Sequence, residues 1–422
     1  MNFVIVSKGF CPRKDPESYC ATRFASALAN AGHSVHVITA ELPSDENSLD
    51  YHVLVHPTMR VDRVKSLGKA PKFPFISWRW LSVFDTDSYD VGSYIAVVRK
   101  VLSGYENPIL ISRTYSWSAL TVAWHCRKLA KEWVAHFSDP MLDQDPNTKL
   151  GRLSHFFKKL WMRRAMRHAD AISVTCKRVR WYYREQLGPC VDKAKFILAT
   201  HIGDFKLSQL ATQSDNLASS PVAIEQSKNP NNRTILHDGD IYGGRGLQIL
   251  ESVRNLNEQG IAVDFIQGRR VKNEGERKKI LSTPHCFILD ENASEELRAR
   301  AKAAQVSFVA DFNTERLSYS PFLMSKFVYQ IYEDKPMVVL SKLESEKHDY
   351  CVRYPEAGLF FADMKEAGSL ERAIKAALEA DPSTFDRTRI RAAFSEEKIA
   401  ADFIEQLNCA DKAELDRKWM ER

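Results

Sequence analysis

Short apolar runs and longer stretches of helical spacing alternate along most of the chain. Runs rich in valine and isoleucine are typical of strands that are buried on both faces of a parallel sheet. In the first half, the pattern predicts strands at 2–7, 34–40, 108–112, 132–140, 169–175 and 194–200, with helices at 17–32 and 117–131. This alternation predicts an α/β fold with helices on both faces of the sheet.

The alternation stops and then starts again. Residues 206–232 are rich in serine, asparagine, glutamine and proline and have little periodicity, which is typical of a linker or a surface excursion. After them, strands are predicted at 233–239, 262–268, 285–290, 306–312 and 337–341, with helices at 247–260, 294–305 and 320–333. The pattern therefore predicts two Rossmann-like domains, 1–200 and 233–395, joined by a linker at 201–232. A C-terminal helix at 396–422 is expected to pack back on the first domain.

The helix predicted at 320–333 has two distinct faces. Ser320 can cap its start, and Pro321 suits the first helical position. Its apolar face is formed by Met324, Phe327, Val328 and Ile331. A second stripe, at the same spacing, is formed by the polar residues Lys326, Tyr329, Gln330 and Glu333. Such a stripe faces either water or a ligand.

Composition narrows the class of protein. The chain has 422 residues, of which 44% are hydrophobic and 27% charged, so it has enough apolar side chains for two globular cores. The net charge of +6 fits a basic patch for phosphate, anionic lipid or nucleic acid. The eight cysteines form no CxxC pair, which predicts reduced thiols in the cytosol. We expect neither a signal peptide nor a membrane-spanning segment, because the apolar runs are too short.

A glycine-rich turn follows the strand predicted at 233–239. Gly239, Gly243, Gly244 and Gly246 would let the backbone approach a phosphate closely, and Arg245 adds a positive charge. The turn is not GxGxxG, and no GxxxxGK[ST] occurs, so nicotinamide-type and P-loop sites lack their signatures. The alternative is a tight strand–helix turn with a surface arginine.

Five segments together resemble one family. These are "LANAGHSVHVIT", "WVAHFSDPML", "RHADAISVTCKRV", "LHDGDIYGGRGLQILESV" and "SKFVYQIYEDKPMVV". In this order they resemble a bacterial glycosyltransferase close to family 4. The resemblance covers nearly the whole chain, and it implies the α/β GT-B fold, with two Rossmann-like domains facing across a cleft.

The resemblance also implies a donor site in the second domain. By likeness to the family, the "SK" pair Ser325 and Lys326 and the turn residues Gly243, Gly244 and Arg245 would lie near the diphosphate of a nucleotide sugar. The free N–H groups expected at the helix start, 320–324, would add to this site.

The chain departs from the family at one feature of this site. Family 4 enzymes usually carry two glutamates eight residues apart, the second on the ribose, and here these positions are Pro321 and Tyr329. Glu333 could reach a ribose from one turn further along the helix. The missing pair leaves the nucleotide and the sugar open. Some related bacterial glucuronosyltransferases similarly lack the pair yet keep the lysine, so its absence does not by itself imply loss of function.

The candidate catalytic residues follow a strand of the first domain. Asp139 comes after the strand, where ligands bind in open α/β sheets, and it could accept the proton of an acceptor hydroxyl in an inverting reaction. In a retaining reaction it would only position the acceptor. His136 is the next candidate. The DxD strings at 85–87 and 143–145 fit no strand end, so no metal cofactor is expected.

Two basic segments concern the acceptor. Lys8, Arg13 and Lys14 lie in the first strand–helix loop, which faces the acceptor in this fold. The segment 152–167 predicts a basic amphipathic helix suited to an anionic membrane surface. The alternative is an ordinary helix with its apolar side in the core and its basic side in water.

The function implied is transfer of a sugar from a nucleotide sugar to a saccharide acceptor, which is lipid-linked in the interpretation we favour, during synthesis of a bacterial surface polysaccharide. The enzyme would work in the cytoplasm, peripheral on the membrane. The alternatives are a GT-B nucleotide-sugar epimerase and a non-catalytic homologue acting as a partner subunit. No nucleic-acid module is recognisable.

Overall fold

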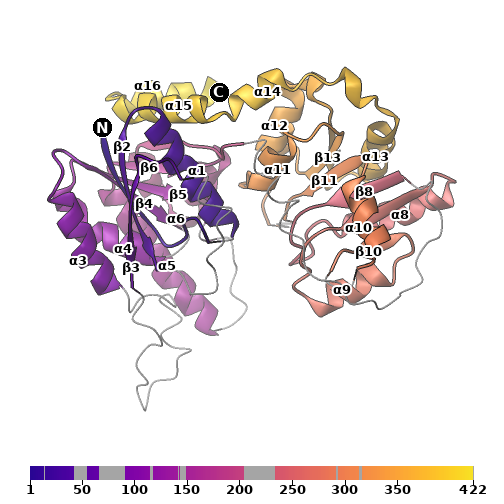
Figure 1. Cartoon of the computed structure of the whole chain (residues 1–422), viewed down its shortest axis with the longest axis horizontal. Coiled ribbons are helices and arrows are strands. Elements are labelled where there is room, and N and C mark those ends of the chain that lie inside the picture. Colours follow the sequence, from indigo (N-terminus) through magenta and orange to yellow (C-terminus); the bar gives the residue numbers. More distant parts are fainter. Residues whose placement is uncertain are drawn as a thin grey trace, which may run out of the picture. The chain divides into compact units, whose positions relative to one another are not determined.

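The chain folds into two compact α/β units (Figure 1). One contains Met1–Ile202 and Ser395–Arg422, and the other contains Gly203–Phe394. The computed structural model describes residues 1–13, 15–41, 55–65, 91–114, 117–140, 142, 149–203, 233–290, 293–312 and 316–421. The linker predicted at 201–232 lies almost entirely outside these residues.

The N-terminal unit is built on a parallel sheet with the strand order β3-β2-β1-β4-β5-β6-β7. Its strands are β1 (Asn2–Ser7), β2 (Ser34–Ala40), β3 (Arg60–Val64), β4 (Ile109–Thr114), β5 (Glu132–Phe137), β6 (Ala171–Val174) and β7 (Phe196–Leu198). Its helices are α1 (Pro16–Asn30), α3 (Val91–Leu102), α4 (Trp117–Cys126), α5 (Lys149–His168), α6 (Arg178–Leu187), α15 (Glu396–Asn408) and α16 (Lys412–Glu421). The edge strand β3 was not predicted, because its sequence, RVDRV, is polar and mostly exposed.

The C-terminal unit repeats this plan with a parallel sheet of order β10-β9-β8-β11-β13-β15. Its strands are β8 (Arg233–His237), β9 (Val263–Gln267), β10 (Cys286–Ile288), β11 (Val306–Ala310), β12 (Tyr319–Ser320), β13 (Met337–Ser341), β14 (Glu344–Ser345) and β15 (Leu359–Asp363). Its helices are α8 (Gln248–Glu258), α9 (Glu274–Leu281), α10 (Glu295–Lys302), α11 (Ser325–Gln330), α12 (Glu346–Arg353), α13 (Ser369–Glu379) and α14 (Thr388–Ala393).

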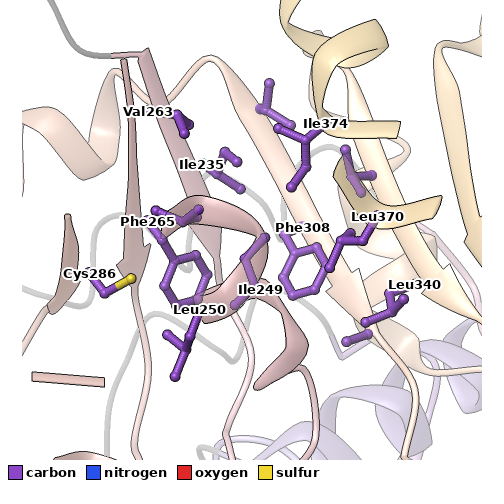
Figure 2. Close-up of a cluster of buried hydrophobic side chains, with 14 of the residues drawn as sticks. Ile235, Ile249, Leu250, Val263, Phe265, Cys286, Phe308, Leu340, Leu370 and Ile374 are labelled. Carbon is purple, nitrogen blue, oxygen red and sulfur yellow. The ribbon is translucent and has the colours of Figure 1, made fainter. Parts of the chain in front are cut away.

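Apolar side chains fill the space between each sheet and its helices. In the C-terminal unit, Ile235, Phe265 and Phe308 on the strands meet Ile249 and Ile374 on α8 and α13 (Figure 2). These strands read as continuous apolar runs because helices cover both faces of a parallel sheet. Because each sheet is rigid, it holds the residues that follow its strands in fixed positions.

The C-terminal segment belongs to the N-terminal unit. Phe403 of α15 packs edge-on against Phe24 of α1, with ring centroids 5.1 Å apart. Gln406 exchanges two hydrogen bonds with the backbone of Leu198 in β7, at 2.9 and 3.0 Å. The segment forms two helices, α15 and α16, and not the single helix expected at 396–422.

The helix predicted from Ser320 begins at Ser325 instead. Ser320 is in an extended strand, β12, which pairs with β14, and so it caps no helix. The buried Phe322 follows it, and the Lys347 ammonium donates a hydrogen bond to the carbonyl oxygen of Phe322 at 2.8 Å. The prediction of the helix start was therefore wrong, because strand pairing and a buried lysine override the local Ser-Pro signal.

Candidate functional site

In both sheets the strand order reverses beside the first strand, between β1 and β4 and between β8 and β11. Ligands of open α/β sheets bind outside the carboxyl ends of the strands at such a reversal. We call these places the N-terminal edge and the C-terminal edge.

Two cations share one carboxylate at the C-terminal edge. Lys326 Nζ lies 2.9 Å from Oδ2 of Asp238, which directly follows β8, and Arg269 Nε lies 2.7 Å from Oδ1. Burial acts to raise the pKa of Asp238, but the two cations outweigh it and hold this pKa below its ordinary value. Lys326 is thus placed at the strand end that its sequence motif predicts, although it already has an anionic partner.

The glycine turn that follows β8 already binds a carboxylate. Gly243, Gly244 and Gly246 have φ values of 61°, 76° and 71°, the left-handed region that favours glycine. The backbone N–H of Gly244 donates a hydrogen bond to Oε1 of Glu276, on α9, at 2.6 Å. Main-chain N–H groups of such turns form concavities that bind anions. The turn therefore directs at least one main-chain N–H at an anionic oxygen, and its phosphate role stays a prediction.

Arg245 points into the unit. It is 7% exposed, and its Nε donates to the carbonyl oxygen of Ala310 at 2.7 Å. Its guanidinium lies 5.0 Å from the ring centroid of Phe312 and also bonds Met324 through Nη2. These contacts join the turn to the end of β11, so in this geometry Arg245 supports the turn more than it presents a charge to a ligand.

The polar stripe predicted on the helix is divided between the two ends of the sheet. Ser325 begins α11, and Tyr329 is half-buried, while Gln330 is buried. Glu333 lies beyond the helix end, where its Oε2 is 2.8 Å from Lys335 Nζ and 3.2 Å from the hydroxyl of Ser307. Both partners are at the amino ends of strands, so Glu333 lies at the opposite end of the sheet from the C-terminal edge, and the geometry does not support its predicted ribose contact.

Asp139 lies at the N-terminal edge, two residues after β5, and is exposed. The preceding residue, Ser138, is buried. A carboxylate at this position can approach a bound hydroxyl, as the sequence predicts for a general base. Its catalytic role stays a prediction.

His136 is held inside the same edge. It is 1% exposed, and its Nε2 accepts a hydrogen bond from Arg113 Nη1 at 3.1 Å. Because a guanidinium only donates, the ring proton is on Nδ1, which donates to the hydroxyl of Ser173 at 2.9 Å. Burial, with the charge of Arg113 and the nearby His201, lowers the pKa of His136 well below its usual value. In this geometry the ring supports the edge and is poorly placed to take up a proton from a substrate.

Glu17 completes this network and was not predicted from the sequence. It lies in the first turn of α1, and its Oε1 accepts hydrogen bonds from Arg113 Nε at 2.8 Å and from the hydroxyl of Ser138 at 3.0 Å. The pKa of Glu17 is raised above its ordinary value, because burial and the charge of Asp139 outweigh the lowering by Arg113 and by the hydrogen bond from Ser138. An acidic residue that opens the helix after the first strand is the signal that would have located it.

The loop predicted to face the acceptor is only partly described. Lys8 is half-buried, and its carbonyl oxygen accepts a hydrogen bond from the Thr39 hydroxyl at 3.1 Å. Arg13 Nε lies 2.8 Å from Oδ2 of Asp15, which caps α1. Lys14 lies outside the described residues. An acceptor role for this loop stays a prediction.

The basic segment 152–167 lies within one long helix, α5. Its buried residues are Met162, Ala165 and Met166. Three large apolar side chains of the same helix are exposed, by 37% at Leu153, 55% at Phe156 and 43% at Leu160. We call these three residues the outer stripe.

No metal site is visible in the part of the chain that the structure describes. Within it, no group of three or more histidine, cysteine, aspartate or glutamate side chains is arranged to hold an ion. Both DxD strings lie outside it. No described helix is long and apolar enough to cross a bilayer.

The N-terminal unit resembles a known protein family. Residues 18–198 match a family model described as a glycosyl transferase 4-like domain. No curated protein matches the chain. The family resemblance seen in the sequence is thus confirmed for the N-terminal unit.

Similar solved structures extend over both units. One is a sucrose-phosphate synthase from Thermosynechococcus elongatus, with 16% identity and a TM-score of 0.58, covering 100% of this chain and 98% of that chain. A glycosyltransferase from Rickettsia africae has 10% identity and a TM-score of 0.53, with 100% and 98% covered. A lipopolysaccharide outer core galactosyltransferase in its apo form has 9% identity and a TM-score of 0.54, with 96% and 99% covered. The predicted fold class is confirmed by these likenesses.

Proposed function

We propose that the chain is a glycosyltransferase that transfers a sugar from a nucleotide sugar to a lipid-linked saccharide at an anionic membrane surface. The proposal is supported by the GT-B fold and by the glycosyl transferase 4-like domain matched at residues 18–198. The setting would be the synthesis of a surface polysaccharide on the cytoplasmic face of the membrane. No metal cofactor is part of the proposal.

In the proposed reaction, an acceptor hydroxyl oxygen bonds to the anomeric carbon of the donor sugar. The bond from that carbon to the phosphate oxygen breaks, and the nucleoside diphosphate leaves with both electrons. If the configuration is inverted, the hydroxyl proton passes to Asp139. If it is retained, the proton passes to the departing phosphate, and Asp139 orients the acceptor.

Support for a diphosphate-binding role comes from the charges at the C-terminal edge. Lys326 and Arg269 both lie against the single carboxylate of Asp238. The main chain of the glycine turn already bonds an anionic oxygen. Charge-assisted hydrogen bonds of this kind are the strong ones in anion recognition.

The outer stripe is the observation that carries the membrane part of the proposal. An ordinary amphipathic helix would bury its large apolar residues, yet Leu153, Phe156 and Leu160 point away from the buried Met162 and Met166. Positions spaced three and four apart share one face of a helix. The helix therefore has an apolar face toward the core and another toward the solvent.

Basic side chains accompany the outer stripe on α5. They are exposed or half-buried, and they are Arg152, Lys158, Lys159, Arg163, Arg164 and Arg167. Each lysine or arginine near an anionic leaflet contributes about 1 kcal/mol of attraction, and apolar side chains gain further from entering the interface. An anionic lipid surface matches both features, whereas free phosphate would leave the apolar side chains in water.

Vesicle flotation tests this surface. The protein should float with vesicles that contain phosphatidylglycerol, less at high salt because screening weakens the attraction, and little with phosphatidylcholine alone. Replacing Phe156 and Leu160 by serine should abolish flotation, as should changing Lys158, Lys159, Arg163 and Arg164 to glutamate.

A matched control is available in the other unit. Leu343 and Val352 are exposed by 54% and 66%, and replacing both by serine removes a similar amount of apolar surface. This double variant should float like the wild type. Equal flotation of the Phe156 and Leu160 variant would contradict the membrane part of the proposal.

A further inference from the structure

Glu17 is a buried carboxylate at the N-terminal edge that the proposed reaction does not use. Its side chain is 10% exposed, and that of its partner Arg113 is 3% exposed. Its other contact is with Ser138, the residue directly before Asp139. A charge this deeply buried is costly to the fold, so its place beside the candidate base calls for an explanation.

We infer that Glu17 is a positioning residue for Asp139: it fixes the turn that carries Asp139 and places a second carboxylate beside it. The inference rests on the proposed role of Asp139 in the transfer reaction. It assigns to the first turn of α1 a function in catalysis that acts through another residue.

Ser138 is held by two hydrogen bonds, one from its hydroxyl and one to its carbonyl oxygen. Its hydroxyl donates to Glu17 on α1, at 3.0 Å, and its carbonyl oxygen accepts a hydrogen bond from the hydroxyl of Thr175, after β6, at 2.8 Å. Pro140, which is buried, follows Asp139 and restricts the backbone on the other side. The exposed Asp139 is thus carried by a turn whose neighbouring residues are buried and bonded.

Two charged groups face Glu17. These come from Arg113 on β4 and from Asp139 after β5, whereas His136 is neutral at ordinary pH because its pKa is well below its usual value. The charge of Asp139 raises the pKa of Glu17. Since the interaction between two charges is mutual, an ionised Glu17 also disfavours the ionised form of Asp139. A base with a raised pKa holds the substrate proton more strongly.

A purely structural ion pair is the competing explanation, and the same helix supplies an example. Arg23 Nη2 of α1 lies 2.6 Å from Oε1 of Glu396, with side-chain exposures of 12% and 16%. This pair joins α1 to α15. It is similar in burial to the pair of Glu17 and Arg113, and so it provides a matched control.

Direct titration of Asp139 tests the electrostatic part without any substrate. In protein with ¹³C-labelled aspartate, the Asp139 carboxyl signal is identified by its absence in Asp139→Asn. In Glu17→Gln its titration midpoint should fall by about one pH unit, the size expected for losing one nearby charge. Glu396→Gln should lower stability but leave the midpoint unchanged. An unchanged midpoint in a folded Glu17→Gln protein would overturn this part of the inference.

Turnover tests the positioning part. The donor for this assay is whichever nucleotide sugar, among UDP-, GDP-, CMP- and dTDP-sugars, raises the melting temperature most. Ser138→Ala keeps every charge, so kcat should fall by about tenfold with KM and the acid limb of the pH profile unchanged, because orientation is lost. An unchanged kcat would overturn the positioning role. If Glu17→Gln does not fold, the kcat of Ser138→Ala still tests the positioning role.

The base role of Asp139 and its coupling to Glu17 can be rejected separately. A fully active Asp139→Asn enzyme would remove the base role of Asp139. A shifted Asp139 titration in Glu17→Gln would still be seen in that case, because it needs no catalysis. A large loss in Asp139→Asn together with an unchanged Asp139 titration in Glu17→Gln would leave the base role intact and reject the coupling to Glu17.

Discussion

The two edges are built on the same sheet plan but hold different charged groups. At the N-terminal edge, the carboxylates of Glu17 and Asp139 lie near Arg113, which pairs with Glu17. At the C-terminal edge, Lys326 and Arg269 share the carboxylate of Asp238, and Glu276 bonds the glycine turn. Each edge also contains a buried, neutral histidine, His136 in one and His237 in the other.

This difference separates two chemical tasks. A carboxylate suits proton uptake from a hydroxyl and repels a diphosphate. Cations beside a turn whose main-chain N–H binds an anionic oxygen suit a diphosphate and stabilise it as a leaving group. The proposed reaction needs both tasks at once, and placing them on separate sheets would keep the proposed base from neutralising the proposed phosphate site. Four variants test this division.

The largest effect is expected for Asp139→Asn. The amide keeps the shape of the side chain but cannot take a proton, so turnover should fall by about 10²–10⁴ while donor binding is retained. Product configuration, measured by NMR, should be inverted. If the product retains the donor configuration, the loss should instead appear mainly in acceptor KM, and the base assignment would be wrong.

Acid should weaken the C-terminal edge through His237. Burial, with the charge of Arg245, lowers the pKa of His237 to about 4, and its Nδ1 donates to Oε1 of Gln267 at 2.8 Å. A group with a lowered pKa in the folded state gives stability that is present above its unfolded value and lost as the pH falls. Between about pH 6.5 and 4 the unfolding free energy should therefore drop by about 3 kcal/mol from this group alone.

Urea unfolding across this pH range measures the effect. His237→Gln removes the titrating ring and should lose less stability on acidification than the wild type. His125→Gln, which changes an exposed histidine at the end of α4, should behave like the wild type. Equal acid sensitivity of all three proteins would show that the buried ring does not control it.

Loss of the charge at Lys326 should weaken donor binding. Its ammonium faces Asp238 at the C-terminal edge, and removing a charge-assisted contact of about 1.5–3 kcal/mol should lower nucleotide-sugar affinity by roughly ten- to a hundredfold in Lys326→Ala. Lys335→Ala is the matched control, because Lys335 forms a similar pair with Glu333 at the other end of the sheet. Comparable losses in both variants would place the site elsewhere.

The smallest effect is expected for Glu276→Gln, and the informative result is whether its affinity for a nucleoside diphosphate rises or falls. The Glu276 carboxylate occupies the N–H of Gly244, and its Oε2 is buried without a hydrogen-bond partner in the described part of the chain. Removing this negative charge should strengthen binding of a nucleoside diphosphate by several-fold, a gain of about 1 kcal/mol. Weaker binding would mean that Glu276 contacts the ligand directly. Glu274→Gln, on the exposed side of α9, is the control.

The sequence predicted the elements whose signal is local. The strands with buried apolar runs, such as β1 and β13, and helix α1 between Asp15 and Gly32 lie where the pattern placed them. Lys326 also reaches a strand end as its motif predicts. These features depend on periodicity and on turn chemistry, which neighbouring residues determine.

The sequence could not reveal features that depend on distant partners. Ser320 has the local chemistry of a helix cap but pairs with β14, and Glu333 has the right helical spacing but ends up beside Ser307. The contacts of Glu17 with Arg113 and Ser138 join residues about a hundred positions apart. Such contacts are set by the packing of the whole domain.

The division between the two edges is tested most directly by calorimetric titration of one nucleoside diphosphate into Asp139→Asn and Lys326→Ala. UDP is the first probe, and GDP and dTDP follow if the wild type does not bind it. The account predicts wild-type affinity in the catalytically impaired Asp139→Asn protein and an affinity lower by roughly ten- to a hundredfold in Lys326→Ala. Wild-type binding by Lys326→Ala, or loss of binding in Asp139→Asn, would contradict it.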